Sequence, residues 1–367
     1  MEKVFNSQAR EYDVFEVAKK SLNETRVCTS VFDWPLAAGQ VLLQVDKFAL
    51  TANNVTYGIT GDMLGYWRFF PTNKGWGRLP VMGFADVVAS NHDDISVGER
   101  VYGFFPMGKY LTINAGRVSV SGFFDTSEHR QGLSPVYARF ERVAANPFYQ
   151  KGTEDYQMLV KGLYTTSWLI DDFMFDNNFF GADQYLITSA SSKTSIALAF
   201  CVKQRGLKPS VGITSKSRVD YVKSLGVYDN VIDYDDIASL DANTPSIVVD
   251  MAGSNTVLSN IHQLFAGNLK FSSRVGATHI NDLYFEGELV GPKPINFFAP
   301  HQVEKRSNEW GSEKLMVNIA QMLNPFIAFC FAHIDIEGIS DMNTLERHYQ
   351  SILLGKQDAK QGLIVTL

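Results

Sequence analysis

The chain has 367 residues, of which 45% are hydrophobic, 13% aromatic and 20% charged. This composition is that of a folded protein with two or three domains, and it excludes a disordered chain. The formal net charge is -6 and no run of lysines and arginines stands out, which excludes nucleic acid as the main partner.

The three cysteines, Cys28, Cys201 and Cys330, lie far apart and form no C-x-x-C pair. This spacing excludes a zinc knuckle, and so sparse a count fits a reducing compartment. Residues 1–13 lack the apolar core of a signal peptide, and apolar stretches such as 325–332 are too short to span a bilayer. We therefore expect a cytoplasmic protein without a membrane partner.

The first 142 residues carry the pattern of β-strands. Short apolar runs at 41–45, 86–89 and 100–105 are separated by turn residues such as Gly39 and Gly98. No helical period is sustained there, so we predict a β-rich first domain.

The pattern changes near Thr153. A helix is predicted over 154–175, and strands then alternate with helices. The predicted strands are 185–188, 210–214, 231–232, 247–251 and 269–275, and the predicted helices are 194–205, 218–225 and 256–265. Gly206 and Gly226 end the first two helices. Such alternation predicts a doubly wound parallel sheet with strands buried on both faces.

The last part of the chain departs from this alternation. We predict a helix at 313–323, a strand at 332–336, a helix at 342–354 and a terminal strand at 362–367. The predicted domains are therefore residues 1–150, residues 151–307 and a return to the first domain over 308–367.

The turn after the strand at 185–188 has the place of a phosphate-binding turn in a dinucleotide-binding βαβ unit. A helix N-terminus offers free N–H groups and a positive dipole end to a pyrophosphate. The turn lacks the glycines of G-x-G-x-x-G, but it supplies hydroxyls and a lysine whose charged hydrogen bond is worth about 1.5–3 kcal/mol. Its residues are Ser189, Ala190, Ser191, Ser192, Lys193, Thr194 and Ser195. The alternative is that Ser191 or Ser192 only caps the helix.

The second strand of the unit is followed by Ser215, Lys216 and Arg218. An NAD enzyme usually has an acidic residue there for the ribose 2′-hydroxyl. Hydroxyls and cations suit a 2′-phosphate instead, so NADP(H) is the predicted cofactor. The alternative, a solvated basic helix start, is disfavoured because cations at a helix N-terminus oppose its dipole.

With these residues in hand, the chain resembles the medium-chain dehydrogenase/reductase superfamily, and within it the zinc-independent quinone oxidoreductases and enoyl reductases. The resemblance spans nearly the whole chain. The matching segments are GQVLLQV at 39–45, VGERVYG at 97–103, VDYVKSLGVYDNVIDY at 219–234, DMAG at 250–253 and QGLIVTL at 361–367.

This resemblance implies an α/β fold: a Rossmann doubly wound parallel sheet plus a β-rich GroES-like catalytic domain. It adds Tyr234, Ala252, Gly253 and Gly276 to the expected cofactor-binding residues. The family's glycine-rich turn aligns with residues 190–195, where all three glycines are absent, and the zinc-ligand cysteines are absent too. The chain therefore resembles a divergent subgroup, for which no metal is expected.

The reaction implied by the resemblance is hydride transfer from NADPH to a quinone, an enone or a similar carbonyl compound. Tyr57 matches an aromatic position of the family and is the candidate proton donor, with Asn53 and Asn54 as orienting groups. The alternative for Tyr57 is a half-buried loop tyrosine.

The aromatic stretch at 65–76 suits a flat, apolar small-molecule substrate, or else packs in the core or at a dimer interface. Similar proteins commonly form homodimers.

Other function classes fit less well. Ser192-Lys193-Thr194 resembles the end of a P-loop, but the required glycines are missing, and no G-x-S-x-G elbow of a hydrolase occurs. The remaining alternative is a non-catalytic member of the same fold that binds NADPH or a partner as a sensor or scaffold. The loss of the turn glycines motivates this alternative.

Overall fold

The computed structural model describes residues 10–251, 253–275 and 289–367. It divides the chain into two compact units, the first made of Met1–Leu159 and Ile334–Leu367 and the second of Val160–His333. The first boundary lies close to the one expected at residue 150. The return to the first unit comes at Ile334 rather than at 308, because the helix that covers 312–333 packs within the second unit.

The first unit is built around a closed barrel of antiparallel strands. Strand β3 (Gln40–Leu50) pairs with β5 (Pro80–Ser90) on one side and with β7 (Tyr110–Ser119) on the other, which closes the ring β3-β5-β6-β9-β8-β7. The remaining ring strands are β6 (Arg100–Pro106), β8 (Gly122–Asp125) and β9 (Arg139–Arg142). Alternating residues such as Val41, Leu43 and Val45 fill the core. The predicted β-rich domain is confirmed.

Further elements of this unit extend the barrel. Strands β17 (Gln361–Val365) and β16 (Asp335–Ile339) continue the sheet from β3. A separate three-stranded sheet, which the sequence did not predict, contains β1 (Glu11–Ala18), β2 (Ser21–Val31) and β4 (Trp76–Gly77). The helices of the unit include α1 (Ala52–Ile59) and α8 (Met342–Leu353), and α2 (Glu154–Asp176) begins here.

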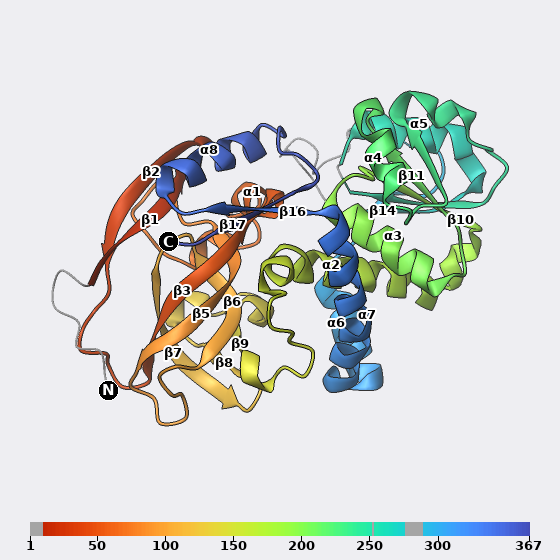
Figure 1. The fold of residues 1–367 in the computed structure, drawn as a ribbon. Coiled ribbons are helices and arrows are strands. Elements are labelled where there is room, and N and C mark those ends of the chain that lie inside the picture. Colours follow the sequence, from red (N-terminus) through yellow and green to blue (C-terminus); the bar gives the residue numbers. More distant parts are fainter. Residues whose placement is uncertain (1–9, 252, 276–288) are drawn as a thin grey trace. The chain divides into compact units, whose positions relative to one another are not determined.

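The second unit contains a parallel sheet whose helices lie on both faces (Figure 1). The strand order is β12-β11-β10-β13-β14-β15, which in chain order reads 3-2-1-4-5-6. The strands are β10 (Gln184–Thr188), β11 (Ser210–Thr214), β12 (Asn230–Asp233), β13 (Ser246–Asp250), β14 (Leu269–Arg274) and β15 (Ile295–Asn296). Every residue of β11 and of β13 is buried, as expected for a sheet covered on both sides. The predicted Rossmann sheet is confirmed.

The connecting helices follow the predicted pattern closely. They are α3 (Lys193–Arg205), α4 (Val219–Ser224) and α5 (Asn255–Phe265). Gly206 and Gly226 adopt positive φ angles of 68° and 63°, which explains why glycines end α3 and follow α4.

The helical hairpin α6 (Ala299–Trp310) and α7 (Ser312–His333) differs from the prediction. The sequence predicted a helix that ends at 323 and a strand that begins at 332, whereas α7 runs through Pro325 to His333. The missing N–H of Pro325 costs one helical hydrogen bond, but burial of Phe326, Ile327 and Cys330 beyond it offsets that loss.

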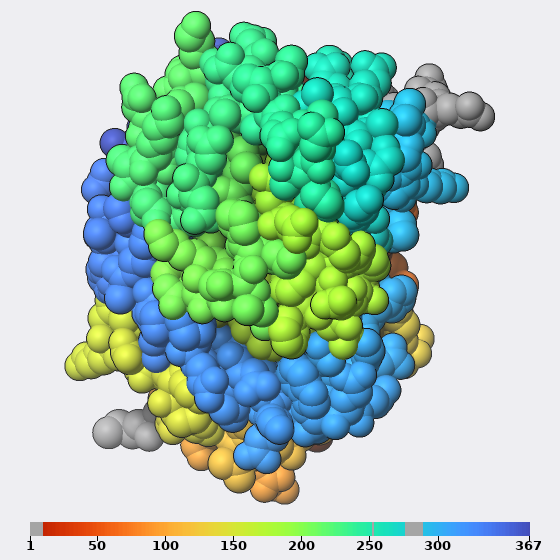
Figure 2. All heavy atoms as spheres, turned by 90° about the vertical axis from the view of Figure 1, so that its right-hand side faces the viewer, coloured from red at the N-terminus to blue at the C-terminus, as the bar shows by residue number. Residues whose placement is uncertain are grey.

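Helix α7 also has a strongly apolar surface. The side chains of Met316 and Phe331 are 43% and 50% exposed. Figure 2 shows α6 and α7, in light blue, at the surface of the second unit. By length and composition α7 is also apolar enough to cross a membrane. One such helix is weak evidence for a membrane span, because core helices of soluble proteins pass the same test.

Candidate functional site

The candidate site lies at the carboxyl edge of the parallel sheet, between β10 and β13. The strand order reverses there, because β11 and β12 lie on one side of β10 while β13, β14 and β15 lie on the other. Connections that leave in opposite directions open a crevice outside the strand ends, and ligands of doubly wound sheets bind in that crevice. Most of the sequence-predicted cofactor residues are at or near these strand ends.

The turn after β10 is compact although it has no glycine. Ser189 adopts a positive φ of 49°, a conformation that usually favours glycine. The amide of Ala190 donates to the Ile213 carbonyl oxygen at 3.0 Å, and the Tyr228 hydroxyl donates to the Ala190 carbonyl oxygen at 2.9 Å. Gly212 lies directly beneath this turn, where a Cβ atom would meet the Ala190 Cβ at 3.0 Å. Neighbouring strands and Tyr228 therefore fix the path of the turn.

The serines at the start of α3 bond mainly to the turn itself. Ser192 is the N-cap, with its Oγ accepting from the Ser195 amide at 3.1 Å. The Ser195 hydroxyl is fully buried and donates to the Thr188 carbonyl oxygen at 2.9 Å. The Ser195 hydroxyl is thus engaged within the turn, and Ser192 caps the helix as the alternative expects. The cofactor-binding roles of both residues stay predictions. Ser191 accepts a long bond of 3.4 Å from Thr214.

Lys193 and Thr194 occupy the first turn of α3 and are partly exposed. The ammonium group of Lys193 lies close enough to Cys330 to affect it electrostatically. Burial raises the pKa of the Cys330 thiol to about 12, and Lys193 opposes that rise. Lys193 thus places a positive charge at the helix N-terminus, beside the end of β10.

The end of β11 carries the predicted cations. Ser215 precedes a short 3-10 helix, Lys216–Arg218, in which Lys216 is exposed and Arg218 is partly buried. Tyr234 follows β12, and its hydroxyl lies 3.4 Å from the Ser189 hydroxyl. The structure therefore brings Tyr234 to the turn, while Lys216 and Arg218 lie at the neighbouring strand end.

On the other side of the crevice, Asp250 ends β13 and Arg274 ends β14 in register with it. Gly253 donates its amide to Asp250 Oδ1 at 3.2 Å and has a φ of 75°. Ala252 and Gly276, the other cofactor residues expected here, lie outside the described residues. Sequence reasoning did not select Arg274 or Thr188. Their positions at the ends of predicted strands were the available signal.

The candidate catalytic residues lie in the first unit on α1. Tyr57 is only 6% exposed, and its hydroxyl accepts from the Asn53 side-chain amide at 2.6 Å. Burial raises the pKa of Tyr57 well above its usual value, so the hydroxyl is protonated near neutral pH. The Asn54 side chain accepts from the Thr51 amide and donates to the Pro80 carbonyl oxygen. Asn54 therefore holds the start of α1 rather than facing a ligand, whereas Asn53 is exposed.

The aromatic stretch at 65–76 is mainly core. Tyr66, Phe69 and Phe70 are buried and pack with Tyr57 and with Phe104 from β6. This supports the packing interpretation over a stacking surface for substrate. Phe69 and Phe70 also line a cavity of about 270 Å³ within the first unit. Asp125 in its wall is paired with Arg130, and Asp33, Gln40 and His129 add further polar side chains to the lining.

The arrangement in the second unit fits a dinucleotide phosphate. The N-terminus of α3 points its dipole toward the strand edge, and Lys193, Lys216 and Arg218 contribute positive charge near it. Among the residues that the structure describes, no group of three or more His, Cys, Asp or Glu side chains is placed to hold a metal ion.

Comparison with solved structures shows the fold. The chain is similar to CurA from Vibrio vulnificus in complex with NADPH, with 14% identity, a TM-score of 0.62 and coverage of 96% of this chain and 98% of that one. It is also similar to the yhdH oxidoreductase from Salmonella enterica in complex with NADP, with 13% identity, a TM-score of 0.55 and coverage of 97% and 99%. A mutant of Etr1p in complex with NADP and crotonyl-CoA gives 11% identity, a TM-score of 0.59 and the same coverage.

These structures share the two-domain fold of medium-chain dehydrogenase/reductases, so the resemblance seen in the sequence is confirmed for the fold. No curated protein matches the chain in sequence. A family defined by its sequences matches residues 48–358, most of the chain. The chain therefore belongs to the family described as "Protein of unknown function (DUF2855)".

Proposed function

We propose that this protein is an NADPH-dependent, metal-free reductase that transfers hydride to a quinone, an enone or a similar carbonyl compound. The observation that carries the proposal is the crevice at the strand-order reversal between β10 and β13, with the N-terminus of α3 at its edge. Structures of similar fold that contain NADPH or NADP support the same cofactor.

The preference for NADP(H) over NAD(H) rests on the end of β11. Lys216 and Arg218 stand where an acidic residue would bind the ribose 2′-hydroxyl of NAD. A 2′-phosphate gains charged hydrogen bonds from such cations. Lys193 would bind the pyrophosphate, and the partly exposed Ser191 would add a hydroxyl.

The substrate class rests on the resemblance of the sequence to quinone oxidoreductases and enoyl reductases. When bound, NADPH supplies the hydride. The protein must then stabilise negative charge on the substrate oxygen with a hydroxyl or an amide. We assign these roles to the Tyr57 hydroxyl and the Asn53 side chain, which are hydrogen-bonded to each other. A cytoplasmic location and a homodimeric state are part of the proposal.

The second candidate is a non-catalytic NADPH-binding sensor or scaffold. One observation favours it: Tyr57 is 6% exposed, in contact with Tyr66 and Phe104, rather than open to a substrate. A protein that binds the cofactor but lacks an accessible proton donor would report NADPH levels without turning over.

The test combines calorimetry with an absorbance assay. NADPH and NADH are titrated into the full-length chain, and the decrease at the NADPH absorbance band is followed with a series of quinones and enones. Tighter binding of NADPH than of NADH, together with turnover, supports the reductase. Binding without turnover supports the sensor. A folded protein that binds neither cofactor contradicts both the reductase and the NADPH sensor, and points to a scaffold that shares only the fold.

A further inference from the structure

Thr188, the last residue of β10, forms hydrogen bonds on both sides of the crevice. Its side-chain hydroxyl donates to Asp250 Oδ1 at 2.8 Å and accepts from the Met251 amide at 3.0 Å. Its backbone carbonyl oxygen accepts from the Ser195 hydroxyl on α3 at 2.9 Å. Thr188 and Asp250 are each 1% exposed, so water does not compete for these bonds.

These contacts connect the two mononucleotide halves of the sheet. Strand β10 and helix α3 belong to the half that carries the phosphate turn and the 2′-phosphate cations. Asp250 belongs to the other half, where it also accepts from the Gly253 amide and lies 3.8 Å from the Arg274 guanidinium. The Arg274 guanidinium in turn donates to the Gly253 carbonyl oxygen at 3.3 Å. The Thr188 hydroxyl thus joins the end of β13 and the contacts of Gly253 beyond it (the Gly253 turn) to the strand that leads into the phosphate turn.

We propose that Thr188, through Asp250, is a positioning residue that sets the spacing between the phosphate turn and the Gly253 turn, and thereby the affinity for the dinucleotide. This inference rests on the proposed cofactor function. The turn has no glycine, so its backbone cannot approach the phosphate closely and side chains must make the contacts. A shift of the turn would move these side chains away from the phosphate, which makes the link through Thr188 important. Small displacements of binding groups are costly in such sites.

The role is distinguishable from a purely structural one. Thr188→Val keeps the shape of the side chain and removes the hydroxyl, which leaves the Met251 amide without its acceptor and Asp250 Oδ1 without this donor. The two turns are then free to relax apart. If the bond were only structural, its loss would lower the midpoint of thermal unfolding but leave the cofactor affinity of the folded protein unchanged.

The experiment measures NADPH dissociation constants by fluorescence titration, at a temperature where thermal unfolding shows every variant to be folded. We expect Thr188→Val to weaken NADPH binding about tenfold or more, and Thr188→Ser, which keeps the hydroxyl, to restore it to within about threefold of wild type. Thr112→Val in β7 of the first unit is the matched control and should leave the affinity unchanged. The Thr112 hydroxyl is buried and has no hydrogen-bond partner among the described residues.

Two outcomes overturn the inference while leaving the proposed function intact: wild type binds NADPH and Thr188→Val binds it equally well, or Thr188→Ser is as weak as Thr188→Val. A wild-type protein that does not bind NADPH refutes the proposed function, and the inference with it. Should Thr188→Val not fold, Asp250→Ala tests the same link by removing the acceptor of the Thr188 hydroxyl. Unchanged affinity in that variant refutes the inference.

Discussion

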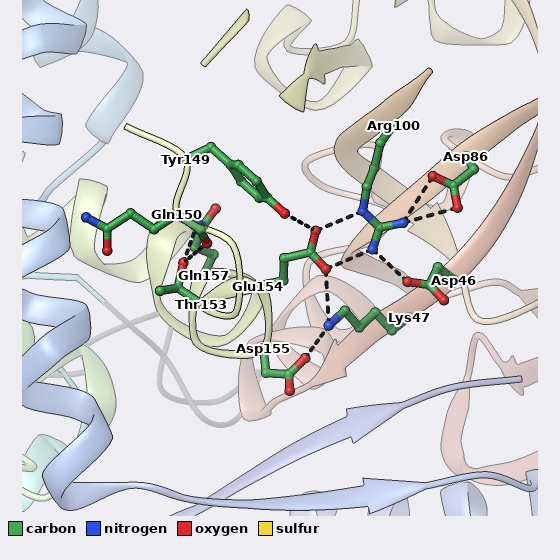
Figure 3. Close-up of polar contacts among 10 residues, drawn as sticks. All are labelled: Asp46, Lys47, Asp86, Arg100, Tyr149, Gln150, Thr153, Glu154, Asp155 and Gln157. Carbon is green, nitrogen blue, oxygen red and sulfur yellow. Dashed lines mark hydrogen bonds and ion pairs between the residues drawn. The ribbon is translucent and has the colours of Figure 1, made fainter. Parts of the chain in front are cut away.

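Arg100 and Glu154 form a bidentate ion pair, with Nε 2.8 Å from Oε1 and Nη2 2.8 Å from Oε2 (Figure 3). The pair joins β6 of the barrel to the first residue of α2. Arg100 also contacts Asp86 and Asp46, and Lys47 lies 3.1 Å from Glu154 Oε2. A planar guanidinium that binds one carboxylate with two parallel bonds fixes direction as well as distance. This pair therefore sets where α2 begins on the barrel.

The first prediction concerns the pH dependence of this pair. Burial raises the pKa of Glu154, but hydrogen bonds from Arg100, Tyr149 and Lys47 outweigh it and bring the pKa to about 2. A pKa below the unfolded value means stability that is present above about pH 4.5 and is lost as the pH falls toward 2. We expect Glu154→Gln to lower the free energy of unfolding by about 1–2 kcal/mol at pH 7, because partly exposed partners screen the pair.

The measurement is chemical denaturation of wild type and Glu154→Gln at pH 7 and at about pH 3. The difference between the two proteins should shrink at the lower pH. Asp46→Asn serves as the control, since its carboxylate is 44% exposed and should contribute little at either pH. Equal differences at both pH values would contradict the assignment.

The second prediction concerns Gly212, beneath the glycine-free turn. A Cβ atom at this position would lie 2.9 Å from Tyr228 Cδ1 and 3.0 Å from the Ala190 Cβ. We expect Gly212→Ala to destabilise the fold by about 1–3 kcal/mol, as overpacking of a dense core does. The Tyr228 hydroxyl bond to Ala190 would be strained, so NADPH affinity should fall as well. Gly267→Ala, which enters open space, is the control for both measurements. A Gly212→Ala protein with wild-type stability would show that the turn is not closely packed.

The sequence predicted the parallel sheet well because its strands are short apolar runs bounded by turn residues. The strand at 210–214 agrees with β11 at both ends. The prediction from the sequence failed at α7. A proline usually ends a helix, but burial of Phe326 and Ile327 in the tertiary structure stabilises the helix beyond Pro325.

The candidate site was harder to predict because it depends on side-chain direction and on register. The residue types at 189–195 indicated hydroxyl donors, but only the structure shows that Ser195 turns inward to Thr188. The bond between Thr188 and Asp250 joins residues 62 positions apart. It requires the parallel pairing of β10 with β13, which no local pattern encodes.

The third prediction separates a catalytic Tyr57 from a packed one. Tyr57→Phe keeps the ring against Phe104 and removes only the hydroxyl that Asn53 contacts. If the hydroxyl donates the proton, kcat should fall by about 10²-fold while the NADPH dissociation constant stays unchanged. Tyr102→Phe, another buried tyrosine of the first unit, should leave kcat at the wild-type value. A Tyr57→Phe protein with wild-type kcat would establish Tyr57 as a packing residue.

The last prediction concerns Lys193, which the glycine-free turn requires as a substitute for close backbone approach. Lys193→Ala should weaken NADPH binding about tenfold or more, since a charged hydrogen bond contributes about 1.5–3 kcal/mol. The loss should be smaller at high salt, because screening already weakens the contact in wild type. Lys203→Ala is the matched control: Lys203 lies on the same helix about 15 Å further along and donates to the Gly226 carbonyl oxygen. If both variants bind NADPH as wild type does, the turn does not hold phosphate, and the fold is shared with the reductases without their cofactor chemistry.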